Sequence, residues 1–569
     1  MRPTRRVQWA AATAAVYAAA VLTVLPSAAE AQARAQRHMI AAANPHAAEA
    51  GLGMLRAGGS AVDAAIAAQM VLTLVEPQSS GIGGGAFLLH FDSKAGDVTA
   101  FDGRETAPAA ATPELFLKAD GTPMGFWDAV VGGRSVGVPG LLRMLELAHQ
   151  RHGRLPWAIL FAPAIELAES GFSVSPRLHK LVAGDKYLKT FPATAAYFYD
   201  ESGAARPVGY RLRNAALAET LRRVATDGAE AFYGGPVAAA IVAAVRGAAP
   251  NPGEMSLADL AGYQAKARAP VCASYRVWRV CGMPPPTSGG VAVLQTLGVL
   301  AQFDMASLKP NSVEAVHLIA EASRLAFADR NRFLADSDFV DVPVERLLDP
   351  AYLRQRAALI SPKASMGKAE PGLPSRHGAM PGQPNPPATT HLSVVDADGN
   401  AVSMTSSIES AFGSRLMAAG FLLNNELTDF SFRPAVEGRA VANRVEPGKR
   451  PRSSMSPSLV LDQDGRLVMA VGSPGGSRII GYVVKALVAG LDWGLDMQAA
   501  ISLPNAVNRN GATDLEDGTA LTALVPGLEA LGHEVRVRAL TSGLHGIAVT
   551  PQGLVGGADP RREGVALGD

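Results

Sequence analysis

The chain has 569 residues, 48% hydrophobic and 18% charged, so it is long enough for several domains or one large one and too apolar for a disordered protein. With 52 Lys and Arg against 51 Asp and Glu, its formal net charge is +1. This balance excludes a basic field that would draw the chain to nucleic acid or to an anionic membrane surface. The 58 glycines and 39 prolines lie in short clusters without a period, which is typical of an α/β protein with many tight turns.

The N-terminus has the pattern of a secretory signal peptide. The first residues are rich in arginine, residues 9–25 are uncharged and apolar, and small residues near Ala31 and Ala33 offer cleavage sites. We therefore expect residues 1–33 to be removed and the mature protein to be exported, periplasmic or secreted, without a membrane attachment. The alternative is an uncleaved anchor, since the apolar stretch nearly reaches the roughly 18 residues that a membrane span needs.

Two helices are predicted after this segment. An alanine-rich run over 46–55 predicts a helix that ends near Gly58. Ser60 and Asp63 have the spacing of a capping box and begin a second helix that extends to about Val75.

A glycine-rich turn and a strand come next. The turn, residues 77–85, leads into 86–91, which have the length and composition of a strand. The turn follows a helix and lacks a Gly-Lys-Ser/Thr sequence, so it predicts no phosphate site. Farther along the chain, Asn311 with Glu314 three residues later predicts the start of a long helix.

Cys272 and Cys281 are the two cysteines of the chain, and they flank a strand-like stretch. In an oxidising compartment they could pair across a hairpin, and unpaired, partly buried cysteines fit the spacing as well. Because no pair of histidines lies beside them in the sequence, they predict no zinc site.

The sharpest change in composition lies at residues 362–388, where seven prolines fall within 27 residues. We expect a flexible, exposed and irregular segment there. Immediately after it, the apolar runs 389–395 and 401–405 flank an Asp-Gly turn, which predicts a β-hairpin. The flexible segment therefore runs directly into a core strand at Thr389.

Thr389 is the candidate nucleophile. A threonine hydroxyl is a weak nucleophile without a base, and a free α-amine on the same residue, with an ordinary pKa of about 7.7–8.0, can be that base. An internal threonine gains this amine only when the preceding peptide bond, Ala388–Thr389, is cut. The alternative is an ordinary strand threonine after a surface loop.

Several charged residues could serve a ligand that carries a carboxylate or an amine. Arg104 is by default a surface arginine paired with a neighbouring acid, and it gains a function if a carboxylate ligand needs a bidentate partner. Glu409, Glu426 and Asp429 lie within 21 residues of one another. They could be solvated acids, or they could surround an ammonium group.

Two further pairs of residues are candidates for binding. Ser453 and Ser454 could be turn hydroxyls or could bind a carboxylate together. Gly475 and Gly476 are not part of a G-x-S-x-G nucleophile elbow, yet adjacent glycines can present backbone N–H groups to an oxyanion.

Taken together, several motifs resemble the gamma-glutamyltranspeptidase family of the N-terminal-nucleophile hydrolase superfamily, over about residues 42–561. The motifs lie at residues 59–65, 77–85, 284–290, 389–391, 422–425, 450–457, 472–478 and 559–561. The resemblance implies an α+β fold of the four-layer αββα sandwich type. It also implies a precursor that cuts itself between Ala388 and Thr389 into a large subunit, 34–388, and a small catalytic subunit, 389–569, which remain associated as one interwoven heterodimer.

The resemblance further implies roles for the candidate residues, and it implies no metal and no organic cofactor. Thr389 is expected to be the nucleophile with its own α-amine as the base, and Ser407 is expected to hydrogen-bond to it. The remaining roles are the oxyanion hole for Gly475 and Gly476, contact with the α-carboxylate of the substrate for Arg104, Ser453 and Ser454, and contact with its α-ammonium group for Glu426 and Asp429.

The implied activity is gamma-glutamyl hydrolysis and transfer, on glutathione and other γ-glutamyl amides, with water or an amino acid or peptide as acceptor. Glu409 departs from this pattern because the family commonly has an asparagine there, so either ammonium binding is tighter or the acyl group is not a plain glutamyl group. One alternative is a glutaryl or cephalosporin-type acylase with the same machinery, which residues 408–415 resemble. A second alternative is an extracytoplasmic binding protein without turnover.

Overall fold

The computed structural model describes residues 33–380 and 388–569. The predicted signal peptide lies outside the described residues except for Ala33, which begins strand β1 (Ala33–Ala35). Within the described ranges, no helix combines the length and the apolar character that a membrane crossing requires.

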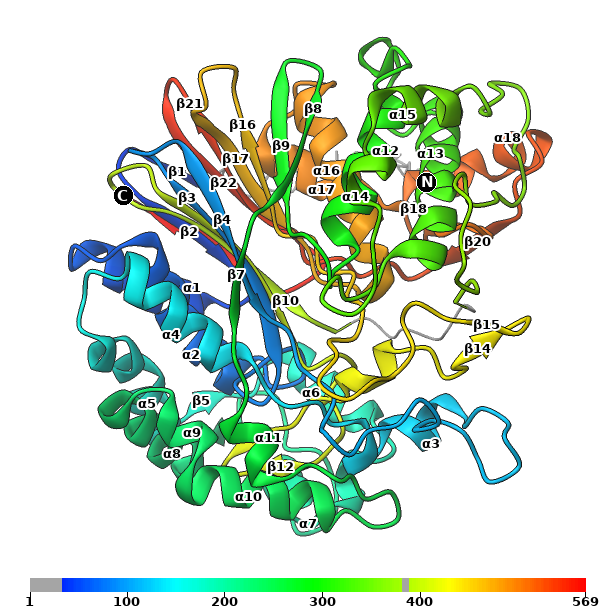
Figure 1. The fold of residues 1–569 in the computed structure, drawn as a ribbon. Coiled ribbons are helices and arrows are strands. Elements are labelled where there is room, and N and C mark those ends of the chain that lie inside the picture. The colour runs from blue at the N-terminus through cyan, green and yellow to red at the C-terminus, as the bar shows by residue number, and fades with distance from the viewer. Residues whose placement is uncertain (1–32, 381–387) are drawn as a thin grey trace, which may run out of the picture. The chain divides into compact units, whose positions relative to one another are not determined.

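Two antiparallel sheets of seven strands form the centre of the fold (Figure 1). The first has the order β1-β22-β21-β17-β16-β9-β8, and the second has the order β23-β2-β10-β11-β3-β4-β7. The strands of the first sheet, after β1, are β22 (Gly553–Ala558), β21 (His545–Thr550), β17 (Leu467–Gly472), β16 (Ser458–Leu461), β9 (Trp278–Gly282) and β8 (Val271–Tyr275). The strands of the second are β23 (Val565–Gly568), β2 (Met39–Ala42), β10 (Thr390–Val395), β11 (Ala401–Ser407), β3 (Gly85–Asp92), β4 (Asp97–Gly103) and β7 (Lys266–Arg268).

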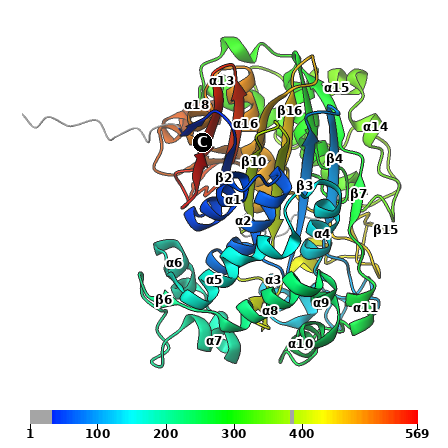
Figure 2. The same ribbon diagram turned by 90° about the vertical axis from the view of Figure 1, so that its left-hand side faces the viewer.

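Helices cover the outer face of each sheet. Side chains alternate across the second sheet, as the two-residue period of a strand requires: Ile40, Leu392 and Val402 belong to the core that includes the helices on one side, and Met39 and Phe87 belong to the core between the sheets. One helical layer contains α1 (Pro45–Arg56), α2 (Ala61–Val75) and α4 (Leu141–His152), and the other contains α12 (Gly289–Leu300), α13 (Val313–Phe333) and α16 (Ile479–Leu491) (Figures 1 and 2). The predicted αββα sandwich is confirmed.

Most of the predicted local elements are present. Ser60 and Asp63 form the predicted capping box at the start of α2, which ends at Val75. The prediction that Asn311 caps the long helix is wrong by one residue. Ser312 is extended and its hydroxyl accepts the cap hydrogen bond from the N–H of Ala315, whereas Asn311 has a φ of 57° in the left-handed region.

The predicted hairpin is confirmed as β10 and β11, and it occupies the middle of the second sheet. Strand β10 pairs with β2 on one side, and β11 pairs with β3 on the other. Strands that follow Thr389 in the sequence are therefore inserted between strands that precede it. The question left open for the cysteines is also answered, because Cys272 and Cys281 are opposite each other on β8 and β9 and form a disulfide.

The described part of the proline-rich segment contains no helix or strand, and it is attached along α13. Successive turns of α13 bind successive residues of the segment between Ser361 and Met380. The pairs are His317 with Ser361, Glu321 with Met366, Arg324 with Gly367, Asp329 with Gly372, Arg332 with His377 and Asn331 with Met380.

The glycine-rich turn after α2 packs against the ends of the central strands. A Cβ atom on Gly84 would lie 2.0 Å from the carbonyl oxygen of Ser407, and one on Gly83 would lie 2.1 Å from that of Leu422. No side chain fits at these positions. The turn therefore supports the end of β11 by close backbone packing, which explains its glycines without an anion.

We predict that Gly84→Ala destabilises the protein by about 2–3 kcal/mol, because the new methyl group would displace the backbone at Ser407. Gly53→Ala is the matched control. Gly53 lies in α1, and no atom lies within 4 Å of the place that its new methyl group would take, so alanine there should add about 0.5–1 kcal/mol through helix propensity. Thermal unfolding of both variants checks this, and an unchanged midpoint for Gly84→Ala would show that the turn has room to move.

Candidate active site

The candidate residues meet at one edge of the two sheets. In the second sheet, Thr390 is paired with Ser406, Ser407 with Gly85, and Ala86 with Gly103. The start of β10 and the ends of β11 and β4 therefore lie side by side. The first sheet contributes the start of β16 and the end of β17, which the Ser403 hydroxyl joins to β11 by donating to the carbonyl oxygen of Val471 at 3.2 Å.

Thr389 is buried and held at several atoms. Its Oγ1 lies 3.0 Å from the Oγ of Ser407. Its backbone N–H donates to the carbonyl oxygen of Ser79 at 3.1 Å, and its carbonyl oxygen accepts from Nη1 of Arg562 at 3.0 Å. Its φ of 79° is in the left-handed region, which is unfavourable for a β-branched residue. The hydroxyl is thus fixed in one place on a strained backbone.

A small pocket opens beside this hydroxyl and brings most of the predicted residues together. Arg104 and Gly475 are not part of its wall; Arg104 lies behind the acids that line it, and Gly475 directly precedes Gly476. The lining residues are Thr389, Ser407, Glu409, Glu426, Asp429, Ser453, Ser454, Met455, Gly476 and Ile479.

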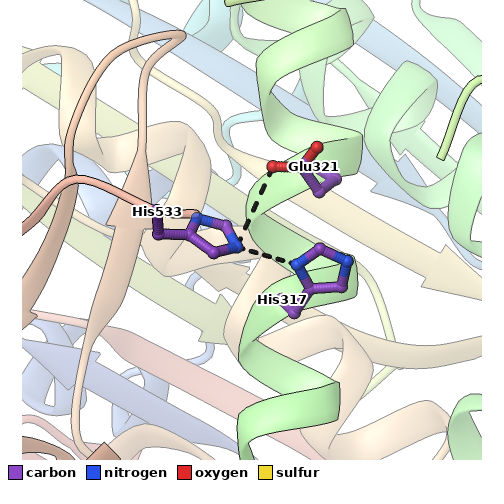
Figure 3. A group of neighbouring side chains, drawn as sticks. All are labelled: His317, Glu321 and His533. Atoms are coloured by element: carbon purple, nitrogen blue, oxygen red, sulfur yellow. Dashed lines mark hydrogen bonds and ion pairs between the residues drawn. The ribbon is translucent and has the colours of Figure 1, made fainter. Parts of the chain in front are cut away.

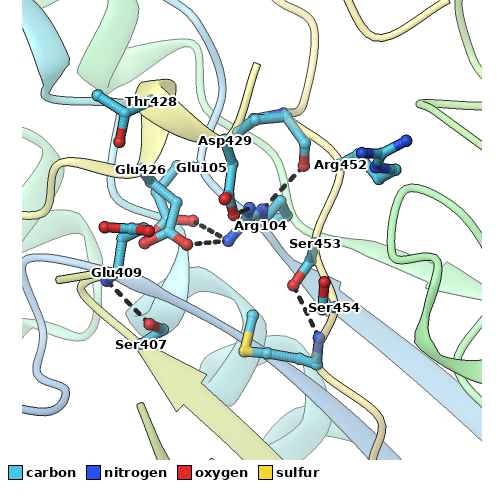
Figure 4. A network of polar contacts seen from close by, with 12 residues as sticks. Arg104, Glu105, Ser407, Glu409, Glu426, Thr428, Asp429, Arg452, Ser453 and Ser454 are labelled. Atoms are coloured by element: carbon cyan, nitrogen blue, oxygen red, sulfur yellow. Dashed lines mark hydrogen bonds and ion pairs between the residues drawn. The ribbon is translucent and has the colours of Figure 1, made fainter. Parts of the chain in front are cut away.

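The expectation that Arg104 is by default a surface residue is wrong. Its side chain is completely buried, and its guanidinium group is paired with Glu426 and, at 2.6 Å, with Asp429 (Figure 4). Glu105, also completely buried, lies 3.6 Å from the same group. The family resemblance implies that Arg104 binds a carboxylate of the substrate. In this structure its guanidinium group is already paired with two carboxylates of the protein, those of Glu426 and Asp429.

Among the described residues, more acids than arginines lie on this side of the pocket. Glu409 completes the group, and its Oε2 accepts a hydrogen bond from Nδ2 of Asn425 at 2.7 Å. Burial, with Asp429 and Glu426 nearby, raises the pKa of Glu409 to about 8. Burial also raises the pKa of Glu426 to about 7, although Arg104 opposes the shift. This side of the pocket is therefore a place where a further positive charge would be stabilised.

Ser453 and Ser454 lie on the other side of Arg104, next to Arg452 (Figure 4). The Oγ of Ser453 accepts from the N–H of Met455 at 3.1 Å, and the Oγ of Ser454 accepts from Nη2 of Arg330 at 2.7 Å. The sequence pattern did not indicate Arg330, because an arginine on a long helix is usually solvated and nothing in its spacing reports burial.

The glycine pair begins the short turn before α16. Gly475 has a φ of 136°, and a Cβ atom there would lie 2.6 Å from the ring of Tyr482. Gly476 has a φ of 60° and reaches the pocket. Only glycine fits at Gly475, and the next residue, Gly476, presents its backbone to the pocket, as an oxyanion site requires.

A separate buried group, His317, Glu321 and His533, has the residue types of a metal site (Figure 3). However, Nη2 of Arg324 lies 3.3 Å from Nδ1 of His533. A guanidinium can only donate, so Nδ1 accepts, and the proton on Nε2 points to Nδ1 of His317 at 2.7 Å. The Nε2–H of His317 then donates to the carbonyl oxygen of Ser361 at 2.8 Å. The Nδ1 lone pairs of both histidines, which a metal ion would need, are therefore used in hydrogen bonds. The bond to Ser361 attaches α13 to the start of the proline-rich segment.

We predict that Arg104→Ala destabilises the fold by about 3–5 kcal/mol, because the buried Glu426 and the partly buried Asp429 would be left without their cation. The exposed pair of Arg222 and Glu169 provides the control, and Arg222→Ala should change stability by no more than about 1 kcal/mol. Thermal or denaturant unfolding measures both. Equal stability of the two variants would mean that Arg104 is not the buried counter-ion of the acids.

Comparisons with known proteins agree with this geometry. The chain is 37% identical to the Glutathione hydrolase proenzyme of Escherichia coli (strain K12), over 93% of this chain and 91% of that protein. It is 38% identical to the Acylase ACY 1 proenzyme of Pseudomonas sp. (strain SE83), over 92% of this chain and 91% of that protein.

Solved structures show the same fold. The cephalosporin acylase from Bacillus halodurans has a TM-score of 0.83 at 29% identity, covering 96% of this chain and 98% of that chain. The gamma-glutamyltranspeptidase of Helicobacter pylori has a TM-score of 0.56 at 33% identity, with 59% of this chain and 96% of that chain covered. The two scores refer to different lengths of this chain, so they do not rank the two activities. A sequence model described as Gamma-glutamyltranspeptidase matches residues 47–569, and with these relatives it shows that the chain belongs to the gamma-glutamyltranspeptidase family.

Proposed function

We propose that this chain is an exported, self-processing gamma-glutamyl hydrolase and transferase that cleaves glutathione and other γ-glutamyl amides through an acyl-enzyme on Thr389. The observation that carries the proposal is the surplus of buried carboxyl groups beside the pocket of Thr389, with one arginine among them. These carboxyl groups would stabilise a positive charge on the acyl group, and a glutamyl group carries such a charge on its α-ammonium group.

Processing is the first step of the proposal. The Oγ1 of Thr389 attacks the carbonyl carbon of Ala388, the peptide C–N bond breaks, and an ester with a free Thr389 amine forms. Water then hydrolyses the ester, which leaves the carboxylate of Ala388 and restores the hydroxyl. The strained φ of Thr389 supports this step. This torsion angle is defined by the carbonyl carbon of Ala388, so cleavage of the Ala388–Thr389 bond removes the strain.

Acyl transfer uses the products of that cut. The new amine of Thr389 accepts the proton of Oγ1, which attacks the γ-carbonyl carbon of the substrate. Ser407, 3.0 Å from Oγ1, positions the nucleophile. The N–H groups of Gly475 and Gly476 stabilise the negative charge on the carbonyl oxygen. The leaving amine departs with the proton, and water or a second amine then releases the acyl group.

The acylase alternative is supported by a specific observation. The Acylase ACY 1 proenzyme is as similar to this chain as the glutathione hydrolase of E. coli is. Moreover, a pKa of about 8 keeps the Glu409 carboxyl group protonated at neutral pH, and a neutral carboxyl group tolerates an acyl chain without an amine. Glutaryl amides are therefore the second candidate substrates.

We predict that purified protein contains two chains, the smaller beginning with Thr389, and that Thr389→Ala remains a single inactive chain. Thr389→Ser retains a hydroxyl at the same place, so it should still be cut and should keep some activity. N-terminal analysis and intact mass measurement check the site. A wild-type protein that is fully active as one uncut chain would overturn the mechanism, since it would have no free threonine amine.

We also predict that γ-glutamyl-p-nitroanilide is preferred over glutaryl-p-nitroanilide by about 30–150-fold in kcat/KM, which corresponds to the charge contact with the ammonium group. The preference should increase from pH 6 to pH 8. Protonated Glu409 is neutral at the lower pH and ionises as the pH approaches its raised pKa of about 8, so the attraction for the ammonium group grows. Both substrates use the same nucleophile and base, so titration of the Thr389 amine cancels in the ratio.

Glu409→Gln should weaken this pH dependence without abolishing it, because Glu426, with a pKa of about 7, also ionises in this range. Glu437→Gln, at an exposed position, should leave it unchanged. Comparable kcat/KM values for the two anilides in the wild-type enzyme would favour the acylase assignment.

A further inference from the structure

The two serines of the pocket have fixed hydrogen-bond directions. The Oγ of each accepts a hydrogen bond from a donor that can only donate, the N–H of Met455 for Ser453 and the guanidinium group of Arg330 for Ser454. Neither hydroxyl donates to another residue in the described part of the chain. Both O–H groups are therefore left to donate to a ligand, and an acceptor with two oxygens fits the pair.

Arg330 holds this arrangement together from α13. Its Nη2 donates to Ser454, and its Nε donates to the Oγ of Ser288 at 2.8 Å. Ser288 in turn donates to the carbonyl oxygen of Ser453 at 2.7 Å. The residue before it, Thr287, donates to the carbonyl oxygen of Met455 at 2.8 Å. One guanidinium group thus fixes the hydroxyl of Ser454 directly and the backbone of Ser453 through Ser288.

The charge of Arg330 is not neutralised by an ion pair. Among the described residues it makes no salt bridge, its third nitrogen donates to the amide oxygen of Asn331, and its neighbour Arg452 also lacks a carboxylate within ion-pair distance. Burial, with Arg452 beside it, lowers the pKa of Arg330 well below its usual value, although Asp429 opposes the shift. A buried cation without a counter-ion is stabilised by an anion that arrives with the substrate.

The opposite holds for Arg104. It is surrounded by Glu105, Glu426 and Asp429, so its charge is already compensated. The pocket of Thr389 therefore has a cluster of carboxyl groups on the side near Glu409 and a guanidinium group without an ion pair behind Ser454.

We propose that Arg330 is a positioning residue for acyl-group specificity, and that it directs the Ser454 hydroxyl toward the carboxylate of the acyl group. The charge of Arg330 complements this carboxylate through the polarised hydroxyl, in addition to any contact that Arg104 makes with it. The inference rests on the proposed acyl transfer by Thr389, but it concerns the carboxylate and not the ammonium group. It therefore applies to glutamyl and glutaryl groups alike.

Four p-nitroanilides separate the two charges. The γ-glutamyl compound has both a carboxylate and an ammonium group, the glutaryl compound has the carboxylate alone, the 4-aminobutanoyl compound has the ammonium group alone, and the butanoyl compound has neither. The quantity of interest is the kcat/KM ratio between compounds with and without the carboxylate. Measured within one preparation, this ratio does not depend on the fraction of protein that has been cut.

For the wild-type enzyme we expect the glutamyl compound to exceed the 4-aminobutanoyl compound by about 100-fold. Arg330→Gln should reduce this ratio to about tenfold or less, mainly through a higher KM for the glutamyl compound. Arg330→Lys, which keeps the charge but not the fork, should give an intermediate ratio. The ratio between glutamyl and glutaryl compounds should not change, because both have the carboxylate.

A double-variant cycle tests whether Arg330 acts through Ser454. Ser454→Ala should lower the carboxylate ratio as Arg330→Gln does, and the double variant should show little further loss. Arg332→Gln is the matched control, because Arg332 lies on the same helix and donates to the carbonyl oxygen of His377. Its ratios should equal those of the wild type.

Several outcomes would overturn the inference. The first is a carboxylate ratio that is unchanged in both Arg330→Lys and Ser454→Ala. The second is a double variant in which the reductions of this ratio by the two single substitutions add up. If Arg330→Gln yields no cut protein, Arg330→Lys and Ser454→Ala decide. Failure of the proposed glutamyl preference is a separate result, since the glutaryl-to-butanoyl ratio still reports the carboxylate contact when glutaryl is the better substrate.

Discussion

The antiparallel register of β10 and β11 is the constraint on which the site depends. It places Thr389 opposite Ser407 at the edge where both sheets end, and a shift by one residue would turn the threonine to the other face of the sheet. The register is held by apolar side chains on both faces, and the end of β11 is supported by Gly84, which admits no side chain. The position of the Thr389 hydroxyl thus depends on the packing of the apolar cores on both faces of the second sheet.

The second organising feature is the separation of charge around the pocket. Acids surround Arg104 on one side, and Arg330 stands behind the serines on the other. Arg104 and its acids compensate one another, whereas Arg330 forms no ion pair among the described residues. Under the proposed function, a zwitterionic acyl group would complement both sides of the pocket, so the charges around the pocket would contribute to the choice of substrate.

Local signals in the sequence predict the local structure well. The capping box at Ser60, the Asp-Gly hairpin after Thr389 and the glycine pair before α16 all depend on neighbouring residues, so their chemistry is visible in the sequence. The family resemblance supplied the layered fold. Burial was not predictable in this way, because it depends on distant segments. Arg104 is enclosed by residues more than 300 positions away, and Arg330 meets Ser454 across 124 positions.

The interleaving of strands on either side of Thr389 also affects how the stability of the protein is defined. A cut at Thr389 would leave β10 and β11 of one chain between β2 and β3 of the other. Separation of the two chains would then require breaking the central sheet, so dissociation and unfolding become the same event. The unfolded state of the cut protein consists of two independent molecules, and its translational entropy grows on dilution. The uncut precursor therefore has an unfolding free energy that does not depend on concentration, whereas that of the mature heterodimer does.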